Sequence, residues 1–366
     1  MAYLVREQIK EIHIEPTSRC NLLCPQCART HKGGINPELP ISDIPHEVYE
    51  SLFDRDLCQQ LAHVYFCGNY GDPVASPELL NELQFLRSRG VRRMTLFTNG
   101  SLQGPDWWRE LAKVLNGQED KIAFSIDGLQ DTNSLYRVNA SWEKVMENCQ
   151  AFISAGGNAR WDWLMFSHNE HQVEEARELS RKIGFSQFNV KATARFVTDK
   201  SYKSGKSEDK IKTRAGELQA GANKNLKDFN SIINRFGSWK TYVNQTSINC
   251  KYQYLGALYL DFESELWPCC WTGAPKYFVR PNSQREQLDQ LFERYGRGFN
   301  SLKRKSLDEI LHHPWFQSEL IESWSGTMDD ANPKLMACGR TCGTEYEFTG
   351  MQGTSNSDIK DLKHQE

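Results

Sequence analysis

The 366-residue chain has no long apolar run and no strong excess of charge of either sign. The absence of 18 or more consecutive apolar residues argues against a membrane-spanning helix. Residues 1–7 lack the apolar region and cleavage site of a secretory signal. The formal net charge is −3, which provides no general attraction to nucleic acid. We therefore expect a cytoplasmic protein with neither a membrane nor nucleic acid as its partner.

Disulfides are also not expected, although the chain contains 11 cysteines. In a long chain without a secretory signal, cysteines are kept reduced and serve more often as metal ligands. The apolar content of 39% supports a substantial core. The length favours two domains, or one large domain with an appendage.

Three of these cysteines lie close together, directly after an apolar segment. Cys20, Cys24 and Cys27 have the spacing C-x3-C-x2-C. Thiolates are soft ligands that suit iron–sulfur clusters and zinc. Three ligands can hold three irons of a cubane cluster and leave the fourth iron open for chemistry. A zinc site completed by a distant fourth ligand is the alternative.

Strand-like and helix-like segments alternate through the first half of the chain. This alternation predicts a parallel sheet with right-handed crossovers, and ligands in such folds gather at the carboxyl ends of the strands. The predicted strands are Ile9–Glu15, Ala62–Cys67, Arg93–Thr98, Ile122–Ile126, Ala159–Phe166 and Gln187–Lys191. The predicted helices are His46–Leu61, Pro77–Arg89, Asp106–Leu115, Trp142–Ala155 and Glu170–Ile183. Six strand–helix repeats fit a partial barrel or a doubly wound sheet.

Polar and glycine-rich motifs follow three of these strands. They are Cys67-Gly-Asn-Tyr-Gly-Asp-Pro73, Thr98-Asn99-Gly100 and Ser125-Ile-Asp127-Gly128. Together with the cysteine spacing, they resemble the motifs of the radical S-adenosylmethionine (radical SAM) superfamily. The resemblance implies a partial (β/α)6 barrel of the TIM type. It also implies a 4Fe–4S cluster on the three cysteines, with S-adenosylmethionine (SAM) on the open iron.

The same resemblance implies which residues contact SAM. They are Gly68, Asn69, Tyr70, Gly71, Asp72, Asn99, Ser125, Asp127 and Arg137. The chain departs from its relatives at Gln26, where an aromatic residue commonly packs near adenine. Candidates for the mouth of the substrate site are Asp162, His168, Asn169 and Lys191, for which packing or helix capping is an equal alternative.

A second set of cysteines follows residue 245, where the alternation stops. Residues 258–271 read as a β-hairpin, and the pattern resembles the auxiliary iron–sulfur domains called SPASM and, in shortened form, twitch. This chain lacks the central C-x2-C-x5-C element of a full SPASM domain, and Ser264 replaces the usual hairpin glycine if Cys269 is the ligand. The resemblance implies a second 4Fe–4S cluster held by Cys250, Cys269, Cys338 and Cys342. Zinc suits four thiolates equally well.

Cys270 adjoins one of these ligands, and whether Cys269 or Cys270 binds the cluster is left open. If Cys270 is spare, it is either structural or a hydrogen-atom donor to a substrate radical. Donation would make the reaction an epimerisation.

The domain organisation follows from these motifs. We expect a radical SAM partial barrel over residues 1–199 and a SPASM/twitch-like domain over residues 246–351. Residues 200–245 form a connector or insertion, and residues 352–366 a disordered polar tail. Residues 200–227 contain eight Lys or Arg against three acidic residues. This is either a solvated connector, which is favoured, or a flap that engages an anionic substrate.

The resemblance implies an enzyme that cleaves SAM reductively to a 5′-deoxyadenosyl radical and abstracts hydrogen from a substrate C–H bond. An electron donor of the flavodoxin or ferredoxin type is its expected protein partner. Dehydrogenation or epimerisation of a sugar-like small molecule is favoured, because the barrel begins near residue 9 and leaves no room for an N-terminal peptide-recognition domain. A peptide maturase is the second interpretation, and a zinc-stabilised, non-catalytic module is the rival of another class.

Overall fold

The computed structural model describes residues 2–193, 195–206, 210–213, 216–279 and 283–346. The polar tail expected over residues 352–366 lies outside the described residues. Within them, no helix combines the length and the apolar character that crossing a membrane would require. All 11 cysteines are free thiols.

Six parallel strands form the centre of the molecule, in the spatial order β1-β4-β5-β6-β7-β8. Their bounds are β1 (Glu11–Ile14), β4 (His63–Phe66), β5 (Met94–Thr98), β6 (Lys121–Ser125), β7 (Ala159–Met165) and β8 (Gln187–Ala192). Neighbours in space follow one another along the chain, as expected for right-handed strand–helix–strand units. The predicted parallel α/β fold of the partial TIM-barrel type is therefore confirmed.

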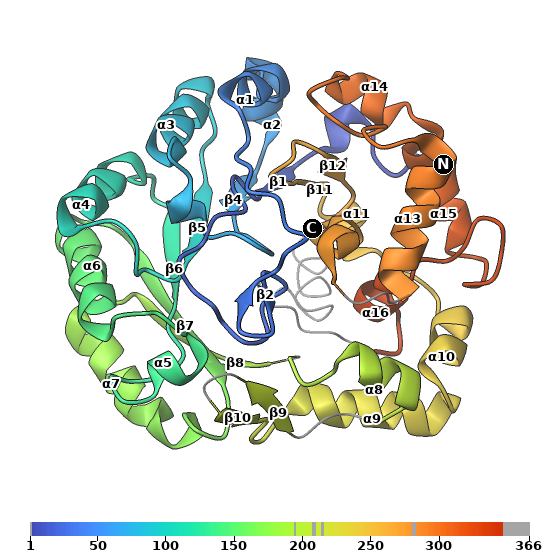
Figure 1. Cartoon of the computed structure of the whole chain (residues 1–366). Helices are drawn as coiled ribbons and strands as arrows, with labels where there is room; N and C mark the ends of the chain where they lie inside the picture. The colour runs from blue at the N-terminus through green and yellow to red at the C-terminus, as the bar shows by residue number, and fades with distance from the viewer. Residues whose placement is uncertain (1, 194, 207–209, 214–215, 280–282, 347–366) are drawn as a thin grey trace, which may run out of the picture.

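Helices cover the outer face of these strands (Figure 1). They are α1 (His46–Leu52), α2 (Arg55–Gln60), α3 (Leu79–Arg89), α4 (Pro105–Val114), α6 (Trp142–Ser154) and α7 (Val173–Ile183). The short helix α5 (Asn133–Tyr136) lies at the cysteine loop instead, since Tyr136 shares a buried cluster with Cys24. Gly90 and Gly184 end α3 and α7 in the left-handed conformation, with φ of 110° and 101°. Glycine adopts this conformation at little cost, which explains why these helices stop where the sequence predicts.

The sheet continues into the C-terminal part of the chain. β11 (Ala257–Leu260) pairs in parallel with β1, and β12 (Leu266–Trp267) pairs antiparallel with β11. The predicted hairpin over residues 258–271 is thus present, and it is built onto the edge of the barrel sheet. The loops that follow β1 and β11 consequently leave the same edge of the sheet.

The remaining helices complete the ring in Figure 1. The helices are α8 (Asp199–Ser204), α9 (Lys224–Phe236), α10 (Trp239–Gln245), α11 (Lys251–Tyr254), α12 (Cys270–Gly273), α13 (Ser283–Tyr295), α14 (Leu307–Leu311), α15 (Leu320–Ser323) and α16 (Met336–Cys342). Two small hairpins consist of β2 (Thr30–His31) with β3 (Gly34–Ile35) and β9 (Lys210–Thr213) with β10 (Gly216–Gln219).

Two predicted helices are interrupted. The helix predicted over His46–Leu61 is two helices, because the Asp54 side chain accepts a hydrogen bond from the Leu57 amide at 2.8 Å and begins a new one. The second lies over Ser306–Trp324, where the spacing of apolar residues such as Leu307, Ile310 and Leu311 predicts an amphipathic helix. This helix breaks after α14 and resumes through a π-helical turn that begins just after Pro314. Proline has no amide hydrogen to continue the helical ladder.

The basic segment that begins at residue 200 has two different faces. Its described lysines are all exposed, namely Lys200, Lys203, Lys206, Lys210, Lys212, Lys224 and Lys227. Its apolar residues Leu218 and Phe229 belong to the buried cluster that also contains Leu22 and Cys24 of the cysteine loop. The segment therefore covers the cysteine loop and presents its charge to solvent.

Candidate active site

The first cysteine trio lies on the loop that leaves the carboxyl end of β1. Cys24 is buried, whereas Cys20 and Cys27 are half-buried. The loop folds on itself through a hydrogen bond from the Cys27 amide to the Cys24 carbonyl oxygen at 3.0 Å. The Leu22 amide donates to the Cys20 sulfur at 3.4 Å. Burial raises the pKa of the Cys24 thiol to about 11, which the nearby guanidinium of Arg137 opposes.

The loops that follow β4 and β5 reach this trio. Asn99 Nδ2 donates to the Cys20 sulfur at 3.7 Å, and the Cys27 thiol donates to the Asn69 carbonyl oxygen at 3.7 Å. Parallel strands bring their carboxyl ends to one edge of the sheet, which explains why residues 42 and 79 positions apart meet here. Three of the predicted motifs are thereby in contact.

Gly68 and Gly71 occupy positions where no side chain fits. A Cβ atom on Gly68 would lie 2.0 Å from the Gly71 carbonyl oxygen, and one on Gly71 would lie 1.9 Å from the Thr17 carbonyl oxygen. The loop after β4 is therefore packed backbone against backbone on the start of the cysteine loop. Glycine is required at both positions for this approach.

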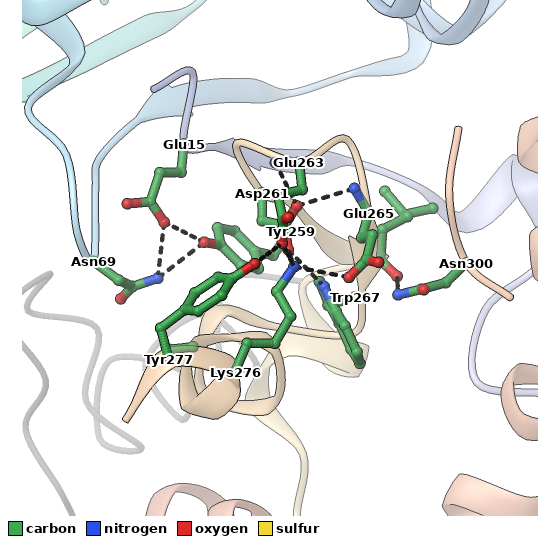
Figure 2. A network of polar contacts seen from close by, with 12 residues as sticks. Glu15, Asn69, Tyr259, Asp261, Glu263, Glu265, Trp267, Lys276, Tyr277 and Asn300 are labelled. Atoms are coloured by element: carbon green, nitrogen blue, oxygen red, sulfur yellow. Dashed lines mark hydrogen bonds and ion pairs between the residues drawn. The ribbon is translucent and has the colours of Figure 1, made fainter. Parts of the chain in front are cut away.

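Residues 68–72, which follow β4, are called the glycine loop below. Glu15, the residue directly after β1, holds this loop in place (Figure 2). Its Oε1 accepts hydrogen bonds from the amides of Tyr70, at 2.7 Å, and Gly71, at 3.0 Å. Its Oε2 accepts from the Tyr259 hydroxyl, and Asn69 Nδ2 lies within 3.4 Å of the same oxygen. Burial raises the pKa of this carboxyl group to about 7.

Asp72 joins the glycine loop to the motif after β5. One carboxylate oxygen accepts from the Thr98 hydroxyl at 2.9 Å, and the other accepts from the Asn99 amide at 2.7 Å. The Asn99 side chain is then oriented through its Oδ1, which accepts from the Ser101 amide at 2.8 Å. Asp72 thus positions Asn99 toward Cys20.

Asp127 and Arg137, both predicted to contact SAM, bind each other. Asp127 Oδ2 accepts from Arg137 Nε at 2.6 Å, and Asp127 Oδ1 accepts from the Leu164 amide at 2.7 Å. The Arg137 side chain is only 11% exposed, so it is not a solvated surface arginine. Burial raises the pKa of Asp127, and the adjacent guanidinium opposes this rise.

A pocket of about 350 Å³, open to solvent, lies at the ends of the central strands. Its lining consists of Cys67, Phe97, Ser125, Asp127, Arg137, Asp162, Leu164 and Lys191. Lys191 Nζ donates to Asp162 Oδ2 at 2.7 Å, and Arg160 Nε lies 2.8 Å from Asp162 Oδ1.

Of the four candidates for the substrate mouth, Asp162 and Lys191 therefore meet at this pocket. Asn169 instead holds its own turn, since its Oδ1 accepts from the Phe166 amide at 2.7 Å. His168 is stacked on the Phe166 ring with centroids 5.3 Å apart. Neither residue is among those that line the pocket.

The second set of thiols gathers between α11, α12 and α16. Cys338 and Cys342 are four residues apart on α16 and so lie on one of its faces. The Cys342 thiol hydrogen-bonds Cys250, which lowers the pKa of Cys250. Cys269, at the start of α12, is close enough to Cys250 and Cys338 for their charges to interact. All four predicted ligands thus belong to one group.

The spacing of the thiols bears on what either set can hold. At a Zn–S distance of about 2.3 Å, tetrahedral zinc brings its ligand sulfurs to about 3.8 Å from one another. Within the described part of the chain, no three thiol sulfurs lie within 4.8 Å of one another. Three carboxylate side chains, Asp261, Glu263 and Glu265, do have oxygens within this distance of one another. In neither set do three described thiols lie as close together as the ligands of one tetrahedral zinc ion.

The acidic group already contains a cation. Lys276 Nζ lies 2.6 Å from carboxylate oxygens of Asp261 and Glu263, and 2.8 Å from Glu265 (Figure 2). The Lys276 side chain is 3% exposed. Its ammonium ties the β11–β12 hairpin to the residues after α12, and this group is a structural ion cluster.

Cys270 and Cys67 lie in different surroundings. Cys270 is buried in the main hydrophobic cluster and is not among the residues that line the pocket. Cys67, like Cys58 and Cys149, is expected from its place in the strand–helix repeats to pack in the barrel, but it lines the pocket. Cys67 is half-buried. Its position directly after β4 and directly before Gly68 was the sequence feature from which its place in the pocket could have been predicted.

Glu15 and Tyr259 are two further residues of the site that the sequence did not indicate. Glu15 belongs to no motif, and Tyr259 lies 244 residues away from it. The position of Glu15 at a strand end was the available signal, since it shares that position with the motif residues.

Comparisons with known proteins agree with this geometry. A cofactor-modifying protein of tungsten-containing aldehyde ferredoxin oxidoreductase from Pyrococcus furiosus is 30% identical over 122 residues. That match spans 33% of this chain and about a third of the relative's length, 32%.

Solved structures also resemble the chain. Native anSMEcpe with bound AdoMet and Kp18Cys peptide has a TM-score of 0.52 at 16% identity, covering 96% of this chain and 94% of that chain. Streptococcus suis SuiB bound to precursor peptide SuiA has a TM-score of 0.49 at 14% identity, covering 89% and 76%. The model of the radical SAM superfamily matches residues 14–180, which contain the cysteine trio and the strand-end loops around it. Residues 14–180 of this chain are therefore a radical SAM domain.

Proposed function

We propose that this protein is a radical SAM enzyme that abstracts hydrogen from a C–H bond of its substrate. Cys20, Cys24 and Cys27 would hold the 4Fe–4S cluster. The observation that carries the proposal is the convergence of two strand-end loops on these thiols, through Asn99 at Cys20 and Asn69 at Cys27. Three thiolates would bind three of the four irons and leave the fourth iron open to a further ligand, with the polar groups of Asn99 and Asn69 beside it.

When bound, the cluster and SAM together would supply a 5′-deoxyadenosyl radical. The protein's own residues position and shield these groups. Asp72 fixes Asn99, and the glycine loop lets backbone amides and carbonyls lie close to the cysteine loop. Arg137 and Arg195 place positive charge near Cys24, where they would stabilise bound thiolates.

The second thiol set would hold an auxiliary 4Fe–4S cluster, with Cys269 as the ligand from the hairpin side. Cys269 rather than Cys270 is favoured, because Cys269 lies near Cys250 and Cys338. The charged groups that act most on Cys270 are instead Cys269, Cys67 and Glu15. Four ligands close such a cluster and suit it to electron transfer rather than to binding a substrate.

The substrate would enter the pocket beside Asp127 and Arg137, where Asp162 and Lys191 offer charges of both signs. The charged and polar lining suits a sugar-like small molecule, and dehydrogenation or epimerisation is the favoured outcome. The Pyrococcus furiosus relative is itself named as cofactor-modifying. A peptide side chain is the second candidate, because the similar fold of anSMEcpe was solved with a bound peptide.

The direct experiment is to reconstitute the protein anaerobically, reduce it with dithionite and add SAM. We expect 5′-deoxyadenosine and methionine from the wild type and neither from Cys24→Ala. A colourless protein that contains zinc in place of iron would instead support the non-catalytic, zinc-stabilised module. Candidate sugars and peptides carrying deuterium then identify the substrate through transfer of label into 5′-deoxyadenosine.

Electrons would come from a protein donor of the flavodoxin or ferredoxin type, for which dithionite substitutes in that assay. Cys270 is tested separately once a substrate is known. If Cys270 donates a hydrogen atom, Cys270→Ser loses the epimerised product while still forming 5′-deoxyadenosine. Undiminished product from this variant would eliminate the donor role.

A further inference from the structure

The glycine loop of residues 68–72 is held from two sides. One side is Glu15, which accepts hydrogen bonds from two of the loop's backbone amides. The other side is the C-terminal segment from Cys269 to Tyr277, whose Ala274 carbonyl oxygen accepts a hydrogen bond from the Tyr70 hydroxyl. The loop is therefore clamped between the N-terminal and C-terminal parts of the chain.

Aromatic packing strengthens the C-terminal side of this clamp. The Tyr70 ring is 3% exposed and meets Phe262 and Tyr277 edge-on, with centroids 5.9 Å apart in each case. Tyr277 is in turn fixed by Asn36, whose Nδ2 donates to the Tyr277 carbonyl oxygen at 2.6 Å. Such a contact leaves Tyr70 little freedom to move independently of this segment.

Tyr259 connects the two sides of the clamp (Figure 2). Its hydroxyl donates to Glu15 Oε2 and accepts from Asn69 Nδ2 at 3.0 Å. Tyr259 lies on β11, the first strand of the hairpin that Lys276 ties to the segment after α12. Glu15, the loop and the C-terminal hairpin thus form one continuous hydrogen-bonded unit.

One end of that unit is a predicted cluster ligand. Cys269 caps the start of α12, and the chain continues without interruption through Ala274 to Tyr277. A change in how Cys269 is bound must shift or loosen α12, and Tyr70 contacts the residues that follow this helix. A physical connection therefore runs from the second thiol set to the glycine loop.

We propose that Glu15, Tyr70 and Tyr259 are positioning residues that link the state of the second thiol set to the affinity of the first site for SAM. This inference rests on the proposed function, because it assigns the glycine loop to SAM. In this arrangement the C-terminal segment forms an outer wall of the SAM site. Loading of the second thiol set then favours SAM binding.

The test compares Glu15→Gln, Tyr70→Phe and Tyr259→Phe with the matched control Tyr49→Phe, which removes a buried hydroxyl on α1 that has no hydrogen-bond partner among the described residues. SAM dissociation constants of the anaerobically loaded proteins are measured by equilibrium dialysis. We expect each test variant to weaken SAM binding about fivefold, the effect of one lost hydrogen bond, and the control to be unchanged. Equal dissociation constants in all five proteins would overturn the proposal.

Coupling to the second thiol set is tested with Cys269→Ala. We expect this change to weaken SAM binding in the wild-type background and to have a smaller additional effect in the Tyr70→Phe background. Effects that simply multiply would show that the two sites are independent. The double-variant comparison separates transmission through Tyr70 from general damage.

Hydrogen exchange of the amides in residues 68–72 provides a readout that does not require SAM. We expect faster exchange in Glu15→Gln and in Cys269→Ala than in Tyr49→Phe, because the clamp is weakened from either side. A wild-type protein that does not bind SAM would overturn the proposed function. Hydrogen exchange would then still test whether the second thiol set is linked to the glycine loop. Unchanged exchange in both variants would overturn the linkage itself.

Discussion

The two cysteine sets of this chain differ in what surrounds them. Around the first set are polar groups from several loops, and two of its three thiols are half-buried. The second set lies among helices and aromatic residues such as Tyr3, and three of its four thiols are buried. The first set adjoins a pocket with charged groups, whereas the second adjoins the hydrophobic core.

This difference indicates a division of labour. Three ligands with polar neighbours suit a cluster that must accept an additional ligand, while four ligands, three of them buried, suit a closed cluster. Burial also lowers access of solvent, which affects the reduction potential of an iron–sulfur centre. Under the proposed function, the same ligand chemistry would serve two purposes, which differ in the number of thiols and in the surroundings that the fold provides.

Removal of one ligand from each set has the largest expected effect. Cys24→Ala should lower SAM cleavage by at least about 100-fold, because the open cluster is lost. Cys338→Ser should leave SAM cleavage within about tenfold of the wild type, because the closed cluster is not needed for that reaction. The measurement is 5′-deoxyadenosine formed per minute with dithionite and no substrate. Equal losses in both variants would remove the distinction between the sets.

A stability experiment tests the Lys276 ion cluster, which lies in the C-terminal part of the chain. Lys276→Met leaves three carboxylates without their buried ammonium and should lower the free energy of unfolding by about 3–5 kcal/mol. The matched control is Lys240→Met, whose side chain is 56% exposed and pairs with Asp329 at the surface. Its effect should lie within about 1 kcal/mol. Urea unfolding of both variants gives the comparison, and similar losses would argue against a structural role for the Lys276 cluster.

The pH dependence of stability tests His13 and Glu15, which lie on and directly after β1, before the loop that carries the first cysteine set. Burial lowers the pKa of His13 to about 4, below the value of about 6.5 in an unfolded chain. The unfolded state therefore binds the proton first, and about 3 kcal/mol of stability present above pH 6.5 is lost as the pH falls toward 4. Glu15, with its raised pKa of about 7, acts in the opposite direction: its contribution is full below about pH 4.5 and is lost as the pH rises through 7.

We expect these two contributions to offset each other between pH 4.5 and 6.5. In His13→Phe the contribution of Glu15 remains, so stability should fall with rising pH over this range. The control His171→Gln changes an exposed histidine and should keep the wild-type profile. Urea unfolding at several pH values checks this, and a wild-type profile for His13→Phe would show that His13 titrates normally.

Much of the barrel follows from local patterns in the sequence. The six strands, their helices and the hairpin near residue 260 were predictable, because strand–helix alternation and glycine caps act over short distances. The interruptions at Asp54 and Pro314 follow from capping and from the missing amide of proline, but they are small features within otherwise regular patterns. Pairing of β11 with β1 joins residues about 245 positions apart and leaves no local signal.

The site was predictable where motifs carry it and not where contacts between distant segments do. The convergence of Asn99 and Asn69 on the cysteine loop agrees with the strand-end rule. The pairing of Asp127 with Arg137 and the role of Glu15 depend on side-chain packing in three dimensions. A buried carboxylate such as Glu15 has no sequence signature, because its partners are backbone amides and a tyrosine from far along the chain.

The most direct measurement is electron paramagnetic resonance of the reduced, loaded protein with and without SAM. We predict two cluster signals in the wild type, of which SAM changes only one. The signal that SAM changes should be absent in Cys24→Ala and retained in Cys338→Ser. A SAM-sensitive signal that survives in Cys24→Ala would contradict the assignment of the open cluster to the first cysteine set.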